Sequence, residues 1–363
     1  MTTNSNFSKT LLFLIGVAAL GIAVITMAEY AYLINAVFLG IIIVVIAAPM
    51  LYWLQDKGLP NWLAFVITLL VLITIGVALV LFLDISVNQF AAAVPTYVEQ
   101  AESLETSVES TLSGLGINTA DIQSALDLIE PAQLLDVIVD ILSGISEAVS
   151  NLVVVVLVAA FLLAEAMGLR ANASRQLSLG QARLARVSQF IHDLREYVVI
   201  TLRLGLVTGV LVTILLLILG VDFPLMWGVL ALLLNFIPTI GIWIAMIPPI
   251  ILALLEFGPT KALIVLVGYL LIDALIENVA KPKLLGEGLN LAPVTIILSL
   301  IFWAAVLGPL GALLAVPLTL AVKELVLAAD EDSRWLAELM SSKRDTPEEP
   351  EPHRDEEDDQ ERA

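Results

Sequence analysis

Seven long runs without a charged residue decide what kind of fold this chain can adopt. A helix needs roughly 20 predominantly apolar residues to cross a bilayer (range about 17–25), and the runs are 17 to 35 residues long. The composition agrees: 59% of the residues are hydrophobic, against about 45–50% in soluble domains. The sequence therefore predicts an all-α polytopic membrane protein with about eight hydrophobic helical segments. The runs are residues 10–28, 30–54, 58–83, 148–164, 204–221, 223–255 and 288–322.

The chain lacks the residues that several classes of function require. The chain has no cysteine and only two histidines, so thiolate or histidine metal sites and catalytic triads are hard to assemble. It contains no G-x-x-x-x-G-K-[ST] phosphate loop, no H-E-x-x-H and no G-x-S-x-G. With a net charge of −19, nucleic acid is not an expected partner. The sequence predicts a protein that is not an enzyme and that uses no cofactor and no metal.

The placement of lysine and arginine predicts the orientation in the membrane, because cytoplasmic loops carry the excess of these residues. Residues 84–148 contain 11 acidic residues and no lysine or arginine, whereas residues 170–203 contain six arginines. Lys9 and Lys57 flank the first two spans. We expect a multi-pass protein of the plasma membrane with both termini in the cytoplasm and residues 84–148 outside.

The same patterns divide the chain into five regions. Residues 1–83 hold N-terminal spans, and 84–148 form an acidic extracytoplasmic insertion whose apolar residues recur at helical spacing. Two roles stay open for this insertion: a helical hairpin on its own membrane domain, or a contact between subunits of a homo-oligomer. Residues 149–199 combine a span with a basic helix in the cytoplasmic interface, 200–326 form the transport core, and 327–363 an acidic disordered tail.

Two of the uncharged runs are too long for one ordinary crossing and are interrupted by proline and glycine. Residues 223–255 contain "NFIPTIG", and residues 288–322 contain "VLGPLGALLAVP". Paired interrupted segments point to transporter sites built from broken helices. The alternative is a pair of long, kinked and tilted spans. Re-entrant hairpins would give six crossings in all, and single crossings would give eight.

The stretch "LIDALIENVAKP" at 271–282 places Asp273, Glu277 and Lys281 four residues apart, hence on one face of a helix. An acidic residue this deep in an apolar run is by default a candidate for function, and two close carboxylates tend to share one proton or cation. The alternative for Glu277 and Lys281 is an ordinary ion pair. Asn278 could contact a ligand or a neighbouring helix, and Asn235 could bind substrate or cap a half-helix.

The C-terminal motifs resemble those of the autoinducer-2 exporter family of membrane proteins. The matching stretches are "NFIPTIG", "EFGPTKALIVLVGYLLIDALIENVAKPKLLGEGLNLAPV" and "GPLGALLAVPL". Asp273 departs from the family pattern, in which many members have an amide there, and it adds a titratable group. Residue by residue, the family's motifs fall on Asn235, Pro238, Gly241, Glu277, Pro282, Gly286, Pro293, Gly308, Gly311 and Pro317.

The resemblance implies efflux of a small molecule. In the namesake members this is a furanosyl signalling compound, and in some relatives sodium or potassium is exchanged for protons. We therefore expect a secondary transporter, with a Na⁺(K⁺)/H⁺ antiporter, a passive channel and a non-transporting oligomeric scaffold as alternatives. The expected partners are the lipid bilayer and a small-molecule or monovalent cation substrate. The predicted binding residues are Asp273, Glu277, Asn278, Lys281 and Asn235, and the predicted backbone breaks that shape the site are Pro238, Gly241, Pro282, Gly308, Pro309 and Gly311.

Overall fold

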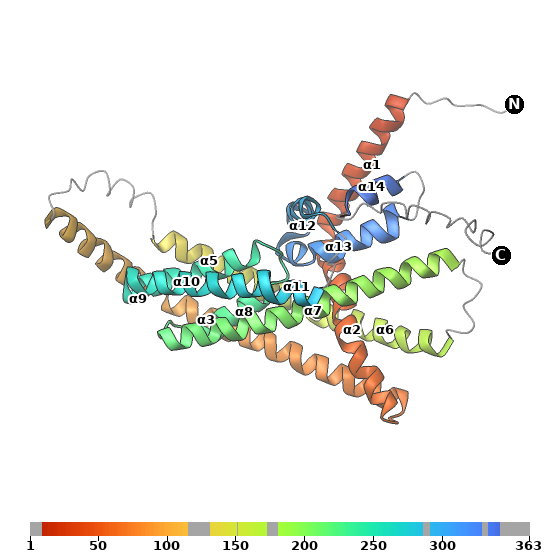
Figure 1. The fold of residues 1–363 in the computed structure, drawn as a ribbon, viewed down its shortest axis with the longest axis horizontal. Helices are drawn as coiled ribbons and strands as arrows, with labels where there is room; N and C mark the ends of the chain where they lie inside the picture. Colours follow the sequence, from red (N-terminus) through yellow and green to blue (C-terminus); the bar gives the residue numbers. More distant parts are fainter. Residues whose placement is uncertain are drawn as a thin grey trace, which may run out of the picture.

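The protein is helical throughout the part of the chain that the structure describes. The structure is a computed structural model that describes residues 9–114, 131–150, 152–172, 181–285, 291–328 and 333–341. All regular elements in these ranges are helices (Figure 1), which confirms the predicted all-α membrane fold. Five of the described helices are long and apolar enough to cross a bilayer: Ala31–Asp56, Asn61–Ala101, Arg186–Leu219, Pro259–Ala280 and Pro293–Leu313.

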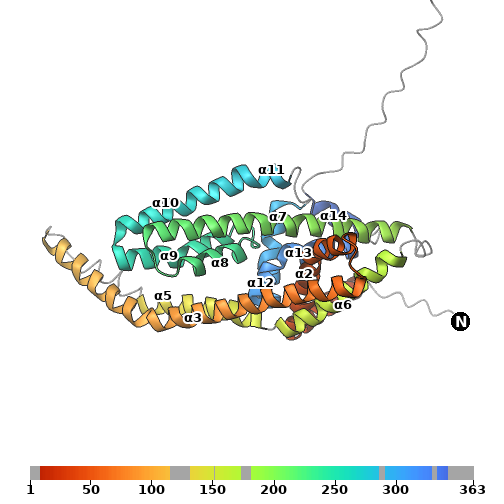
Figure 2. The same cartoon turned by 90° about the horizontal axis from the view of Figure 1, so that it is seen from below.

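The N-terminal half consists of long helices. Helix α1 (Lys9–Glu29) and α2 (Ala31–Asp56) are separated by Tyr30 alone, and α6 (Leu152–Asn172) packs against α2. Helix α3 (Asn61–Gly114) has 54 residues. At about 1.5 Å per residue it is far longer than a hydrocarbon core of ~30 Å. Helix α5 (Pro131–Ser150) packs beside it (Figure 2). Both described arms of the predicted insertion are thus helical; the turn predicted between them lies outside the described residues.

Helix α7 (Gln181–Leu219) differs from the prediction, which separated a basic interfacial helix from a span at residue 200. The structure has one continuous helix of 39 residues. Its sequence contains no proline, and its glycines, Gly205 and Gly209, are inside the span itself, so nothing in this region stops the helix. The basic stripe is therefore the first part of α7, and its face with Leu194 and Val198 is buried against the protein.

The first broken run folds back on itself. Helix α8 (Pro224–Leu234) and helix α9 (Gly241–Phe257) are joined by residues 235–240, and the chain then continues into α10 (Pro259–Leu275). The Nζ of Lys261 at the start of α10 donates a hydrogen bond to the carbonyl oxygen of Leu219 at the end of α7, at 3.0 Å. The hairpin of α8 and α9 thus begins and ends at the Leu219 end of α7. With 11 residues, α8 spans about 17 Å, only part of a bilayer core.

The second broken run forms a hairpin that enters from the opposite end. Helix α12 (Pro293–Leu313) turns at Gly308, and α13 (Ala315–Ala321) packs against it and continues into the π-helical segment η2 (Val322–Leu327), which packs against α7. One end is fixed where the N–H of Ala292 donates to the carbonyl of Met340, at 2.8 Å. At the other end, Arg186 in the first part of α7 donates to the carbonyl of Ala328, at 2.9 Å. Both runs thus fold as hairpins, the shape that the re-entrant alternative requires; Pro293–Leu313 is also among the helices long enough to cross a bilayer, so the number of crossings stays a prediction.

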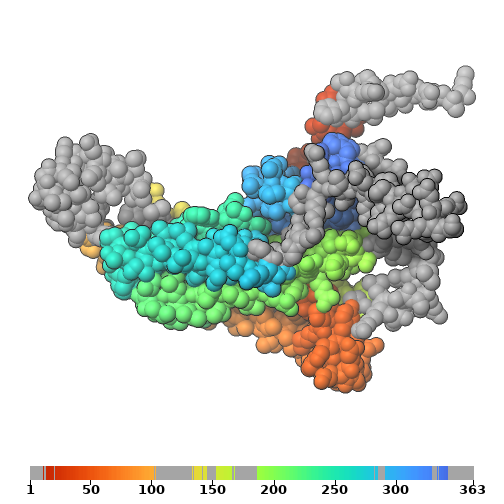
Figure 3. Space-filling model, viewed as in Figure 1, coloured from red at the N-terminus to blue at the C-terminus, as the bar shows by residue number. Residues whose placement is uncertain are grey.

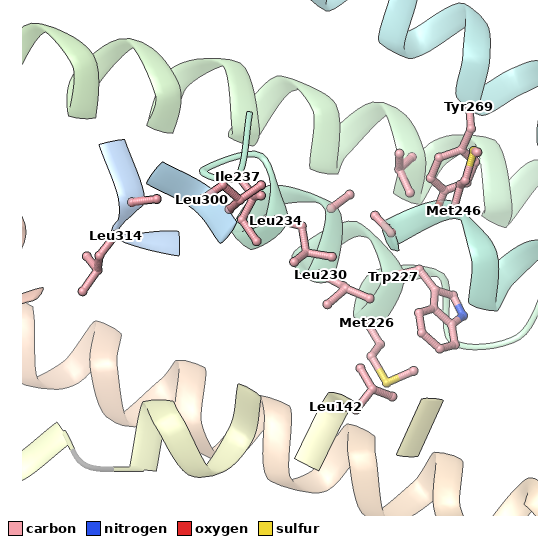
Figure 4. Close-up of a cluster of buried hydrophobic side chains, with 14 of the residues drawn as sticks. Leu142, Met226, Trp227, Leu230, Leu234, Ile237, Met246, Tyr269, Leu300 and Leu314 are labelled. Atoms are coloured by element: carbon pink, nitrogen blue, oxygen red, sulfur yellow. The ribbon is translucent and has the colours of Figure 1, made fainter. Parts of the chain in front are cut away.

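The packing distributes apolar side chains between a shared core and an exposed surface. One cluster joins side chains from both hairpins, α5, α7 and α10 (Figure 4), with Trp227, Leu314 and Tyr269 fully buried. Helices α7 (green) and α10 (blue-green) form much of the face that Figure 3 shows. Large apolar side chains remain exposed on many helices, for example Ile218 at 78% and Phe161 at 70%. Such an exposed apolar belt suits contact with lipid.

The C-terminal region also differs in part from the prediction of disorder over 327–363. Helix α14 (Arg334–Leu339) follows η2 and packs against it, and Ala337 is buried. The apolar residues of "RWLAELM" supply a face that the more acidic sequence beyond residue 344 lacks. Disorder therefore does not begin at 327; the strongly acidic stretch 345–363 lies outside the described residues.

Candidate functional site

The tip of the first hairpin is a tight turn over residues 235–240. Thr239 has a positive φ of 67°, an uncommon conformation for a residue with a side chain. The N–H of Ile240 donates to the carbonyl of Pro238 at 2.7 Å, and the N–H of Gly241 donates to the carbonyl of Ile237 at 3.1 Å. A Cβ atom on Gly241 would overlap the carbonyl oxygen of Leu234. The two half-helices can therefore meet at this angle only with glycine at 241.

Helix α7 holds this tip in place. The side-chain amide of Asn235 donates to the carbonyl of Thr201 at 3.1 Å, and the buried hydroxyl of Tyr197 donates to the carbonyl of Phe236 at 3.0 Å. Gly209 and Gly228 face each other across α7 and α8, where a Cβ on either would lie within 2.7 Å of the other residue's carbonyl oxygen. Small residues thus let the two helices approach closely, and one backbone carbonyl at the break, that of Phe236, finds its partner on α7.

The predicted carboxylates lie opposite this tip. Helix α10 continues through the π-helical segment η1 (Ile276–Ala280) into α11 (Lys281–Leu285), and Asp273 and Glu277 both face a pocket that also contains Asn235. The pocket is lined by Thr208, Asn235, Ile237, Thr239, Ile242, Asp273, Ile276 and Glu277. π-Helical turns occur frequently at functional sites. The structure therefore brings together three residues that are up to 42 positions apart in the sequence (277 − 235).

The pocket is small in this conformation. The cavity has a volume of about 20 Å³. A cavity needs roughly 10–15 Å³ to hold one water, so the pocket has room for one or two waters or for a monovalent cation with few waters. An organic molecule with several carbon atoms would require the hairpin or α10 to move. The carboxylates, the amide and the threonine hydroxyls are all oxygen-bearing groups that suit a hard cation or a proton.

The two carboxylates differ in their partners. The Nζ of Lys281 lies 2.8 Å from both carboxylate oxygens of Glu277, and both side chains are about one-third exposed. Such a partly exposed i,i+4 pair contributes about 0.3–0.5 kcal/mol to stability. No ion pair or hydrogen bond of the Asp273 side chain occurs with another residue in the described ranges. Asp273 is therefore the carboxylate most available to an exchangeable cation or proton.

The other predicted residues lie outside this pocket. Asn278 is exposed on a different face of η1, and Lys281 reaches Glu277 without lining the pocket. Pro282 is within α11. Gly308, Pro309 and Gly311 shape the second hairpin instead: Gly308 has φ 73° and ψ −159°, and a Cβ on Gly311 would overlap the carbonyl oxygen of Trp303. Five of the six predicted backbone breaks thus belong to two separate tips, whereas Pro282 is at neither, because the helix continues through it.

Two threonines of the pocket were not anticipated from the sequence. Thr208 is 3% exposed and its hydroxyl donates to the carbonyl of Leu204 at 2.9 Å, while Thr239 is exposed at the tip. Thr208 is one of two threonines in the apolar run 204–221, and nothing in the run distinguishes it from Thr213. Only the packing of α10 and η1 against α7 brings it to the carboxylates. For Thr239, its place inside the N-x-x-P-x-x-G motif was a usable signal.

An aromatic cluster ties α3 to the base of the first hairpin. Phe90 is fully buried, with its ring centroid 5.5 Å from that of Trp227 and 5.8 Å from that of Phe223. Two helical turns further along α3, the hydroxyl of Tyr97 donates to Oδ2 of Asp222 at 2.9 Å. The insertion and the hairpin base are thus joined by ring packing and by a hydrogen bond to a carboxylate.

We expect Tyr97→Phe to loosen this connection. Removing a hydrogen bond to a charged group costs about 1.5–3 kcal/mol, and because Asp222 is exposed and can bind water instead, the lower end of that range applies. The measurement is the free energy of unfolding of the full chain in mixed micelles. Tyr32→Phe, at a tyrosine that is 56% exposed, is the control and should change stability by less than about 0.5 kcal/mol. Equal effects of the two variants would contradict a stabilising role for this hydrogen bond.

Comparison with known proteins now adds to this geometry. The profile described as AI-2E family transporter matches residues 10–331. The chain belongs to this family. The AI-2 transport protein TqsA of Escherichia coli K12 is 32% identical over 303 residues, which cover 84% of this chain and 88% of that protein. A Haemophilus influenzae protein named "Putative transport protein" is 30% identical over 328 residues, covering 89% of this chain and 93% of that protein.

Family membership assigns the general role of the fold just described. The protein is a multi-pass membrane transporter, and the family and these relatives are transport proteins rather than enzymes. The matched region includes both hairpins and every residue that lines the pocket. Within the described ranges, no three His, Asp or Glu side chains are grouped to hold a metal ion.

Proposed function

We propose that this transporter exports a small molecule and couples the export to a proton or monovalent cation at Asp273 and Glu277. One observation carries the proposal: two carboxylates within an apolar helix face the tip of a broken hairpin across a pocket that also contains Asn235. A charge at such depth costs free energy that a bound proton or cation reduces. Competition between two cations for one acidic pair is sufficient for exchange.

The transport mechanism that we propose is alternating access around the two hairpins. They enter from opposite ends of α7, which is the arrangement that broken-helix transporters use to open a central site to either side in turn. In this scheme residues 200–326 are the transport core and the arms of 84–148 lie outside the plasma membrane. Both termini are cytoplasmic, as the distribution of arginine and lysine favours. The exposed apolar faces of α3 and α5 would join subunits of a homo-oligomer.

A Na⁺(K⁺)/H⁺ antiporter is the second candidate, and the size of the pocket favours it. A space of about 20 Å³ accepts a cation or a water without rearrangement, whereas an organic cargo requires an opening motion. In the antiporter, Asp273 and Glu277 would bind the transported ions themselves rather than a coupling ion.

The test is proton movement into proteoliposomes that contain an internal pH dye. Three gradients are imposed on the wild-type chain: sodium, potassium, and a metabolite extract limited to molecules below about 1 kDa, a size range set by ordinary ligand pockets. Proton movement driven by the extract but not by the salts supports the exporter, and movement driven by either salt alone supports the antiporter. We expect Asp273→Asn to abolish whichever movement occurs. Absence of proton movement under all three gradients would contradict coupling through these carboxylates.

A further inference from the structure

The tip of the second hairpin contacts a buried asparagine that belongs to neither hairpin. Helix α12 is interrupted at Gly308, which frees the carbonyl of Leu307 from its regular helical partner. The side chain of Asn35 on α2 reaches this carbonyl, with its Nδ2 donating to the oxygen of Leu307 at 3.0 Å. Asn35 is only 6% exposed. The contact joins residues 272 positions apart in the chain.

The oxygen of the Asn35 side-chain amide has no hydrogen-bond donor within the described ranges. The Oδ1 atom of Asn35 is buried and accepts no hydrogen bond from any residue in the described ranges. The orientation is fixed, because exchanging the oxygen and nitrogen of the amide would place Oδ1 against the oxygen of Leu307. A buried acceptor without a donor costs free energy, and each such atom in a native structure requires an explanation.

Three other side chains in the described ranges also have a buried atom without a hydrogen-bond partner, those of Gln100 on α3, Glu256 on α9 and Tyr269 on α10, and none of them lies at the second hairpin tip. Further buried polar side chains are paired. The hydroxyl of Thr68 donates to the carbonyl of Ala64, that of Ser299 donates to the carbonyl of Ile296, and Thr319 accepts a hydrogen bond from the indole N–H of Trp303. These groups find partners on their own helix or within the second hairpin. The Asn35 oxygen instead lies beside an interrupted helix, where transporters expose backbone groups to solutes.

We propose that Asn35 and the tip of the second hairpin bind a hydroxyl group of a small, uncharged solute. The site offers an acceptor, which a hydroxyl satisfies by donating one hydrogen bond to Oδ1. An anion would lie against the acceptor Oδ1, which cannot donate a hydrogen bond to it, and an alkali cation would need several more oxygen ligands than Asn35 supplies. This site is separate from the Asp273 pocket and does not rest on the proposed ion coupling.

The binding test uses D-ribose as the hydroxyl-bearing probe and 1,4-dioxane as an ether that accepts but does not donate hydrogen bonds. The thermal midpoint of the full chain in lipid nanodiscs is measured with about 10 mM of each. At ten times the dissociation constant a ligand raises the midpoint by roughly 2–4 °C. We expect this shift for the wild type with ribose only. Asn35→Leu should lose the shift, and Thr68→Val, a buried polar position with a satisfied hydroxyl, should retain it.

A shift of equal size in Asn35→Leu, or no ribose shift in the wild type, would overturn the proposal and leave a fixed water as the partner of Oδ1. Repeating the measurement in Asp273→Asn/Glu277→Gln separates this proposal from the ion coupling, because the ribose shift should persist there.

A separate experiment tests whether solutes reach Asn35. Because the chain has no cysteine, a single introduced cysteine is the only thiol that can react. Asn35→Cys and Thr68→Cys are each treated with the small neutral reagent 2-hydroxyethyl methanethiosulfonate in nanodiscs. If solutes reach the second hairpin tip, Cys at position 35 should react at least about tenfold faster than Cys at position 68, whose native threonine is fully buried away from any broken helix. Equal, slow reaction at both positions would show that no solute reaches Asn35 and would overturn the proposal.

Discussion

Asp273→Asn combined with Glu277→Gln should abolish ion-coupled flux while leaving the fold intact. Both substitutions keep the side-chain volume and remove the group that exchanges a proton or cation. We expect coupled flux in proteoliposomes to fall by about 100-fold or more, which corresponds to about 2.8 kcal/mol at 1.4 kcal/mol per tenfold change. The physical reason is that an amide can hydrogen-bond in the pocket but cannot gain or lose a proton in this pH range.

Stability distinguishes this loss from unfolding. The Glu277–Lys281 ion pair is about one-third exposed on both sides, so its removal should cost no more than about 0.5 kcal/mol. Asp273 has no ion pair to lose within the described ranges, and neutralising an acid inside an apolar helix lowers its burial cost. The thermal midpoint of the double variant should therefore equal or exceed that of the wild type.

The single variants assign the roles of the two acids. If Asp273 is the exchanging group and Glu277 is held by Lys281, Asp273→Asn should account for most of the loss. Glu277→Gln with Lys281→Gln, which removes the ion pair without changing net charge, should retain more flux. Unchanged coupled flux in the Asp273→Asn/Glu277→Gln variant would rule out a coupling role for the pocket and leave the carboxylates as structural groups.

The sequence predicts the hairpins better than it predicts the length of the helices. Proline and glycine in the middle of two long apolar runs are local signals, and each run is interrupted at one such place: the first at 235–240 and the second at Gly308. Pro248, Pro249 and Pro317 lie inside α9 and α13 without ending them. Local signals do not predict that a helix continues, because continuation depends on the absence of a residue that ends the helix. The change from a basic stripe to an apolar run near residue 200 indicates a boundary, yet α7 passes through it because no residue there ends a helix.

Of the candidate site, too, the sequence predicts one part and leaves the other to the packing of the helices. The spacing of Asp273 and Glu277 on one helix face follows from the sequence, and the family motif adds Asn235. Thr208 and Asn35 are contributed by α7 and α2, and their positions depend on how helices far apart in the sequence pack. Asn35 stands out in its run as a strongly polar side chain among mostly apolar ones, so an amide within a predicted span is a signal worth examining. Its carbonyl partner Leu307 could not be inferred from the chain alone.

Gly241→Ala should have the largest effect on the fold itself. The added Cβ would overlap the carbonyl oxygen of Leu234, an atom of the backbone that cannot rotate away. Relief requires α8 and α9 to separate, which would pull the tip from the Asn235–Thr201 and Tyr197–Phe236 hydrogen bonds on α7. Overpacking of this kind costs about 3 kcal/mol. We expect a lower thermal midpoint and loss of transport, measured on the same purified protein.

Two further glycines make this prediction specific to the hairpin tips. A Cβ added to Gly144 in α5 would meet no neighbouring atom within 4 Å, so Gly144→Ala should be neutral or stabilise by about 0.5–1 kcal/mol, as for an unhindered glycine in a helix. Gly311→Ala should behave like Gly241→Ala, because its Cβ would overlap the carbonyl of Trp303 across the second hairpin. If all three substitutions were tolerated equally, the close approach of the half-helices would be wrong, and the pocket that depends on it would have to be placed elsewhere.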